Sequence, residues 1–168
     1  MDPMDEILRQ WQKENPSLSL RGMEVFGRLG QVALLASNVV ETNLARFGLK
    51  LGEFDVLASL RRSGSPFRLN PTQLWQGMLL SSGAMTNRLD RLETAGYIER
   101  LADPNDRRAT LVSLTEKGLK LVEEAVLSHT QNEDTSIQDL TDEEINTLNS
   151  LLTKLKLSIE KSQESNKG

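Results

Sequence analysis

The sequence predicts a mainly α-helical protein with one small β-hairpin. Three observations support this: apolar stripes with helical spacing run through most of the chain, helix caps and glycines punctuate its centre, and one pair of alternating strands flanks a turn-rich loop. The chain has 168 residues, 38% hydrophobic and 26% charged, which is typical of a globular protein with a real core.

The first 50 residues predict two helices. Apolar residues with helical spacing from Met4 to Trp11 predict a short amphipathic helix that stops before Pro16. A long segment rich in Val, Leu and Ala, residues 21–47, predicts a second helix that Gly48 closes as a C-cap.

Residues 51–115 predict a compact series of short elements. A helix is expected over residues 52–63, where SGSP breaks it. The stretch NPTQLWQGM predicts a short helix with Asn70 as its N-cap, and SSGAMTNRLDRLETAG predicts another that ends at Gly96. Two alternating apolar runs, residues 97–101 and 109–114, flank the stretch DPNDRRAT, which indicates a β-hairpin with a longer loop.

Residues 116–168 predict two further helices. The first is expected to run to about Thr130, where the polar stretch QNEDTSIQD separates it from the second. Thr141 and Glu144 form a T-x-x-E capping box, and an apolar stripe follows as far as Leu155. Because so little chain surrounds the apolar stripes at the two ends, we expect both ends to form a helical interface in a homodimer.

Positive charge is concentrated in the middle of a chain whose formal net charge is −4. Residues 61–110 carry a net charge of +3, and all their basic groups are arginines, whose planar fork suits phosphates and base edges. A solvated face is the alternative explanation. However, Arg107 and Arg108 are adjacent at the predicted hairpin tip, where surface pairing would stabilise the fold little.

The order helix, short helix, capped helix and hairpin predicts a winged helix-turn-helix. A capped helix on a helical support fits the major groove of DNA, and the hairpin reaches the minor groove. Met85, Leu89 and Leu92 share the helix face that should pack on the support. The predicted DNA-binding residues belong to this helix and to the hairpin tip, and they are Ser82, Gly83, Thr86, Asn87, Arg91, Arg107 and Arg108.

These motifs form one continuous run, LGEFDVLASLRRSGSPFRLNPTQLWQGMLLSSGAMTNRLDRLETAGYIERLADPNDRRATLVSLTEKG. The run resembles the MarR family of dimeric winged-helix regulators, and the resemblance spans about residues 20–155. It implies a homodimer that binds a pseudo-palindromic operator, usually as a repressor that a small ligand releases. Residues 1–50 would then supply dimerisation helices and the lid of a ligand pocket, 51–115 the DNA-binding lobe, and 116–168 the C-terminal dimerisation helices.

The sequence also resembles the urate-responsive, PecS-like branch of that family. Those proteins carry a Trp on an extra N-terminal helix, an Asp on the helix before the winged motif, an Arg in the recognition helix and an Arg on the first wing strand. The matching positions are Trp11, Asp55, Arg88 and Arg100. The resemblance therefore implies that these four residues bind a small anion such as urate.

The positions of the four residues in their predicted elements support this ligand site to different degrees. Arg88 lies on the shoulder of the packing face of its helix, and we expect it to converge with Arg100 on one anion. Taken alone, Asp55 would be a surface carboxylate and Trp11 a core residue. The resulting hypothesis is a switch in which Asp55 pairs with Arg88 until an anion displaces the carboxylate.

Two alternative functions stay open. One is a MarR-type regulator of a different aromatic or phenolic ligand, and the other is a winged-helix interaction module without DNA binding. An enzyme is excluded, because the sequence has no G-x-G-x-x-G after a strand, no nucleophile with a base and no spare chain for a catalytic domain.

Metal sites, cofactors and membrane contact are not expected. The chain has no cysteine and a single histidine, His129, which we expect to be solvated rather than to sense pH. No apolar run approaches the ~18 residues of a membrane span, and the acidic start MDPMDEILRQ is unlike a secretory signal. We therefore expect a cytoplasmic protein.

Overall fold

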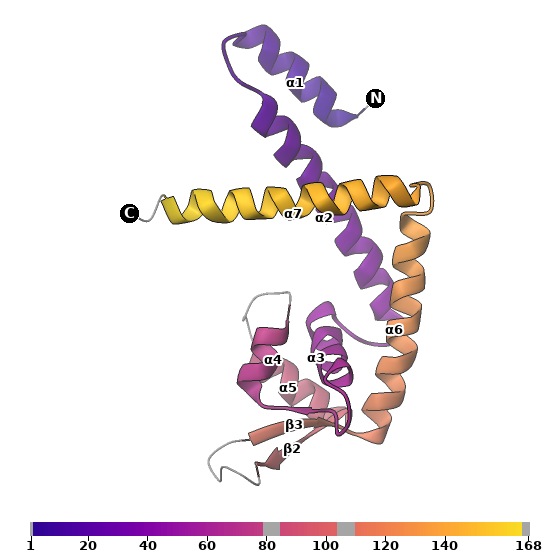
Figure 1. Ribbon diagram of the computed structural model, residues 1–168. Helices are drawn as coiled ribbons and strands as arrows, with labels where there is room; N and C mark the ends of the chain where they lie inside the picture. Colours follow the sequence, from indigo (N-terminus) through magenta and orange to yellow (C-terminus); the bar gives the residue numbers. More distant parts are fainter. Residues whose placement is uncertain (1, 79–84, 104–109, 166–168) are drawn as a thin grey trace. The chain divides into compact units, whose positions relative to one another are not determined.

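The computed structural model describes residues 2–78, 85–103 and 110–165 (Figure 1). The chain divides into two compact units, residues 1–132 and 133–168. The described elements are α1 (Pro3–Glu14), α2 (Arg21–Ala45), α3 (Leu51–Arg62), β1 (Arg68–Leu69), α4 (Pro71–Gly77), α5 (Met85–Thr94), β2 (Ile98–Ala102), β3 (Thr110–Leu114), α6 (Glu116–Ser136) and α7 (Asp142–Ser165). The fold is thus mainly α-helical with a small sheet, as predicted.

Helix α1 is capped and held against α2. The Asp2 carboxylate accepts a hydrogen bond from the Met4 backbone N–H at 2.9 Å, as an N-cap does. Met4 is buried against Gly27 of α2, where a Cβ would collide with the methionine thioether. Arg28 of α2 lies 3.1 Å from a carboxylate oxygen of Asp2 and 2.6 Å from one of Asp5. These contacts fix α1 to the first half of α2.

The core of the first unit lies in the winged lobe around α3. Val56, Leu57 and Leu60 of this helix are fully buried. They pack with apolar residues from the end of α2, from α4 and α5, from β2 and β3, and from α6. In Figure 1 α2 leads from α1 to this lobe. The lobe therefore has a core of its own.

A three-stranded antiparallel sheet completes the lobe, with strand order β1-β3-β2. The hairpin pairs Ile98 with Leu114 and Ala102 with Thr110, which confirms the predicted strands. Strand β1 was not predicted, because its two residues are too short to show an alternating pattern. It pairs Arg68 with Ser113 and extends the sheet beyond the hairpin.

The start of α6 is joined tightly to the hairpin through the stretch LTEKG, residues 114–118. The Thr115 hydroxyl donates to the Gly96 carbonyl at 2.7 Å and accepts from the Gly118 N–H at 3.0 Å, so it caps α6. The Thr115 N–H donates to the Tyr97 carbonyl at 3.1 Å. A Cβ at Gly118 would collide with this carbonyl, so the close approach requires glycine.

Most of the predicted caps are present. Asn70 and Gln73 form a reciprocal capping box at the start of α4, with bonds of 2.8 and 3.0 Å. Gly96 has a φ of +74° just beyond α5, which is the left-handed conformation of a helix C-cap. The serines that open the predicted helix SSGAMTNRLDRLETAG lie outside the described residues.

Helix α6 is longer than predicted, since it continues through Ser136 rather than ending near Thr130. The polar residues 131–136 include neither Gly nor Pro, so nothing in them breaks a helix, and polarity alone was a poor stop signal.

In the second unit, Thr141 and Glu144 form the predicted capping box at the start of α7. No residue of α7 is buried. No described helix is both long and apolar enough to cross a membrane.

Candidate functional site

The first turn of α5 presents small polar side chains to solvent. Thr86 and Asn87 are exposed, whereas Leu89 and Leu92 are buried in the lobe core, as the helical wheel predicted. Four of the predicted DNA-binding residues, Ser82, Gly83, Arg107 and Arg108, lie outside the described residues. Their roles stay predictions.

Arg91, also predicted to contact DNA, points toward the start of α3. Its Nη1 lies 3.4 Å from Glu53 Oε1, and its side chain is exposed. Glu53 is buried, and its other oxygen accepts from the Lys50 N–H at 2.9 Å. Arg91 therefore connects α5 with the first turn of α3.

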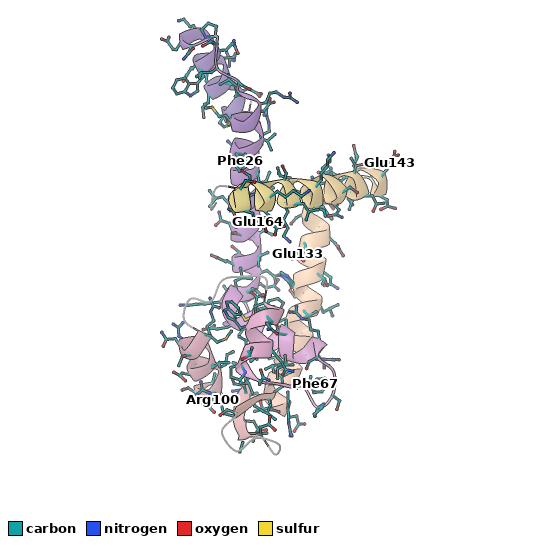
Figure 2. All side chains as sticks on the ribbon, turned by 60° about the vertical axis from the view of Figure 1, so that its left-hand side comes forward. Phe26, Phe67, Arg100, Glu133, Glu143 and Glu164 are labelled. Atoms are coloured by element: carbon teal, nitrogen blue, oxygen red, sulfur yellow. The ribbon has the colours of Figure 1, made fainter. Side chains whose placement is uncertain are left out.

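Arg100 ties the first wing strand to α5. Its two terminal nitrogens lie 2.6 Å from Asp90 Oδ1 and 2.8 Å from Glu93 Oε2, and its backbone N–H also donates to Glu93. Figure 2 labels Arg100 on the lobe. An exposed ion pair is worth little by itself, but one fork held by two carboxylates orients the strand relative to the helix.

Arg88 lies on a different side of α5 from these carboxylates. At about 100° per residue, positions 90 and 93 are about 200° and 140° away from position 88. Arg88 and Arg100 therefore do not converge within the described chain. The Arg88 guanidinium packs over Gly52 of α3, where an added Cβ would lie 2.6 Å from Arg88 Cζ. Its Nη1 is buried without a hydrogen-bond partner.

Asp55 is half-buried, and the expectation of a surface carboxylate is wrong. Its Oδ2 is buried without a hydrogen-bond partner. The wheel grouped Asp55 correctly with Ser59 and Arg62, but Ser59 is only 2% exposed. Helix α3 is packed on several sides, so the side opposite its leucines is not a solvent face.

Burial dominates the electrostatics of Asp55. It raises the pKa of the carboxyl above its ordinary value, because the charged form loses solvation. The positive charges of Arg62, Arg88 and His129 act in the opposite direction and lower the pKa of Asp55 in part. Three cationic or ionisable groups from three helices thus surround one carboxylate.

The predicted closed pair between Asp55 and Arg88 is absent. Within residues 2–78 and 85–103 no ion pair or hydrogen bond joins the two side chains, although the charge of Arg88 acts on Asp55. Each side chain instead keeps one buried polar atom unsatisfied, an acceptor on α3 and a donor on α5. Unsatisfied buried polar groups are costly, so this arrangement is suited to a guest with both a donor and an acceptor.

His129 of α6 adjoins this site, which corrects the expectation of a solvated side chain. Its ring centroid lies 4.7 Å from that of Phe54, the residue before Asp55, with the two planes inclined by 57°. Its Nδ1 is buried. No local pattern in the sequence indicates this contact, because positions 54 and 129 are far apart in the chain.

Within one chain, Trp11 does not lie at the site formed by Asp55 and Arg88. It lies on α1, its side chain is 45% exposed, and α1 packs on the first half of α2. In Figure 1 α3 and α5 lie near the other end of α2. Among the described residues no group of three or more His, Asp or Glu side chains could hold a metal ion.

Comparisons with known proteins identify relatives of the chain and of its fold. Residues 49–110 match the MarR family. The HTH-type transcriptional regulator PecS of Dickeya dadantii is 35% identical over 149 residues, which cover 89% of this chain and 90% of PecS. The multiple antibiotic resistance protein MarR of Salmonella typhimurium is 38% identical over 104 residues, covering 61% and 70%. The crystal structure of an Escherichia coli MarR mutant complexed with operator DNA superposes with a TM-score of 0.69 at 30% identity, covering 83% of this chain and 99% of the other.

Proposed function

This chain belongs to the MarR family of DNA-binding transcriptional regulators, and we propose that it acts as a homodimeric repressor that urate or a similar planar anion releases from a pseudo-palindromic operator. The observation that carries the ligand proposal is the pair of unsatisfied buried atoms, Asp55 Oδ2 and Arg88 Nη1, on adjoining helices of the DNA-binding lobe. The likeness to the E. coli MarR mutant that was crystallised with operator DNA supports the operator part.

The donor and acceptor of the site suit the chemistry of urate. A urate monoanion has ring N–H groups that can donate to Asp55 Oδ2 and oxygens that can accept from Arg88 Nη1. A simple carboxylate ligand would satisfy Arg88 but would leave Asp55 without a donor. This complementarity favours urate over benzoate-like anions.

The position of Arg88 links such a ligand to DNA binding. Arg88 belongs to α5, the helix whose first turn exposes Thr86 and Asn87. An anion that draws the guanidinium away from Gly52 acts on the same rigid helix that would enter the major groove. To release DNA effectively, the anion must favour the released state by about 3 to 5 kcal/mol.

Exposed apolar stripes support the homodimer. In α2, Val32 is 61% exposed and Leu34 and Leu35 are each 65% exposed, and α7 exposes Leu148, Leu151, Leu152 and Leu157. Phe26, also exposed, lies on the part of α2 away from the lobe (Figure 2). Stripes of this size on a soluble regulator favour burial against a second copy.

A footprint on the DNA upstream of the protein's own coding sequence tests the proposal. We expect protection of two half-sites about one helical turn apart, and loss of that protection with saturating urate. Protection that persists unchanged at saturating urate would rule out the ligand. Salicylate and urate compared in the same assay separate this proposal from a regulator of another aromatic anion.

Replacement of Arg107 and Arg108 by alanine separates a DNA-binding protein from an interaction module. We expect weaker binding to all DNA sequences and a flatter dependence of the affinity on salt. The reason is that a variant with fewer contacts to the DNA backbone or groove releases fewer counterions when it binds. Unchanged affinity and salt dependence would contradict the predicted wing contact.

A further inference from the structure

The proposed anion site has an electrostatic difficulty. An anion that reaches Arg88 also approaches the Asp55 carboxylate, whose charge repels it. Arg62, which shares the Asp55 side of α3, opposes this repulsion only partly, because it is exposed and donates to Ser59 Oγ at 3.1 Å. A further positive charge close to Asp55 would strengthen anion binding.

Helix α6 supplies a group that can carry this charge. His129 packs against Phe54, has a buried Nδ1, and acts electrostatically on Asp55. The other charged groups that act on Asp55 are Arg62 from α3 and Arg88 from α5. Helix α2 contributes a neutral amide: the Asn43 side chain donates to the hydroxyl of Ser128, the residue before His129, at 3.0 Å.

We propose that His129 is the third member of the anion site, and that a planar monoanion held by Arg88 is also held by the protonated imidazole of His129, so that binding takes up a proton. The location of the site rests on the proposed function. The role of His129 and the resulting pH dependence go beyond it.

The sign of the pH dependence follows from linkage. A bound anion stabilises the imidazolium form of His129. Because this coupling is reciprocal, the anion binds more tightly at a pH at which the imidazole is already protonated. Affinity for the anion should therefore rise as the pH falls from about 8 toward about 6, the range in which imidazoles ordinarily titrate. Uptake of one full proton corresponds to about a tenfold gain in affinity per pH unit.

The single histidine makes the test direct. In the intact protein the imidazole C–H signals in an NMR spectrum belong to His129 alone. We expect saturating urate to move the midpoint of its titration to higher pH. Urate affinity, measured by calorimetry, should rise toward low pH in the wild type and lose most of that rise in His129→Gln, which keeps a polar side chain but cannot become charged. A titration that saturating urate leaves unmoved, or the same pH dependence in the variant, would overturn the proposal.

If urate does not bind at all, urate is not the ligand. Two charge variants then still test whether His129 belongs to the site. Without ligand, Asp55→Asn removes a negative neighbour and should move the His129 midpoint to lower pH, whereas Arg88→Gln removes a positive one and should move it to higher pH. Opposite movements would retain the three-residue site for another anion. If neither variant moves the midpoint, His129 is not part of the site.

Discussion

The winged lobe and the long flanking helices bury their apolar residues in different ways. Helix α3 of the lobe buries six of its 12 residues, and its core receives side chains from every neighbouring lobe element. Helix α7 buries none of its 24 residues, and the middle of α2 exposes its leucines. The lobe is therefore stabilised from within one chain, whereas the flanking helices leave much of their apolar surface exposed within it, which is why we propose that a second copy covers them.

The largest effect expected within one chain comes from the joint between the hairpin and α6. Gly118→Ala should destabilise the protein by about 3 kcal/mol, because its Cβ would collide with the Tyr97 backbone rather than with a movable side chain. Chemical denaturation measures this loss. Gly22→Ala in α2 is the matched control, since nothing lies within 4 Å of its Cβ position, and it should be neutral or slightly stabilising. Equal stability of the two variants would show that the joint is looser than described.

A charge introduced on the flanking helices should weaken association between copies without unfolding the lobe. Leu35→Asp places a carboxylate on the exposed stripe of α2. We expect the wild type to sediment as the proposed dimer and this variant as a monomer, while the circular dichroism of the lobe helices is retained. Leu35→Met should remain dimeric, because it preserves an apolar side chain of similar volume. A dimer that survives the aspartate would place the interface elsewhere.

A smaller effect is expected at Asp55. Burial raises the pKa of its carboxyl, so the ionised form is disfavoured in the folded state; this penalty is present above the folded pKa and disappears as the pH falls below the unfolded value. Asp55→Asn should therefore raise the thermal midpoint at about pH 7 by about 2 °C, a modest value because solvent screens a half-buried group. The gain should vanish at about pH 3. A loss of stability at neutral pH would mean that the carboxylate is favourably paired.

Local signals in the sequence were sufficient for most of the lobe. The Asn70 cap, the terminating Gly96 and the two hairpin strands were predicted, because each depends on residues a few positions apart. Strand β1 was not predicted, because two residues are too few to show an alternating pattern of apolar and polar side chains. The end of α6 was misplaced because a polar stretch without glycine or proline can remain helical.

The site was harder to predict because its contacts connect distant parts of the chain. A helical wheel gives one buried face, but α3 is covered by α5 and α6 on further sides, so Asp55 was wrongly placed on the surface. Gly52, on which the Arg88 guanidinium packs, gave no signal of its own. The contact of His129 with Phe54 depends on tertiary structure alone.

In the proposed switch, an anion acts on operator binding through Arg88. The most direct test is the urate concentration that half-releases a fluorescently labelled operator, measured by anisotropy for the wild type and for Arg88→Gln. We expect the variant to bind the operator within a few fold of the wild type and to need at least about tenfold more urate for release, which corresponds to about 1.4 kcal/mol of lost ligand binding. Release of both proteins at the same urate concentration would show that Arg88 does not connect the anion to operator binding.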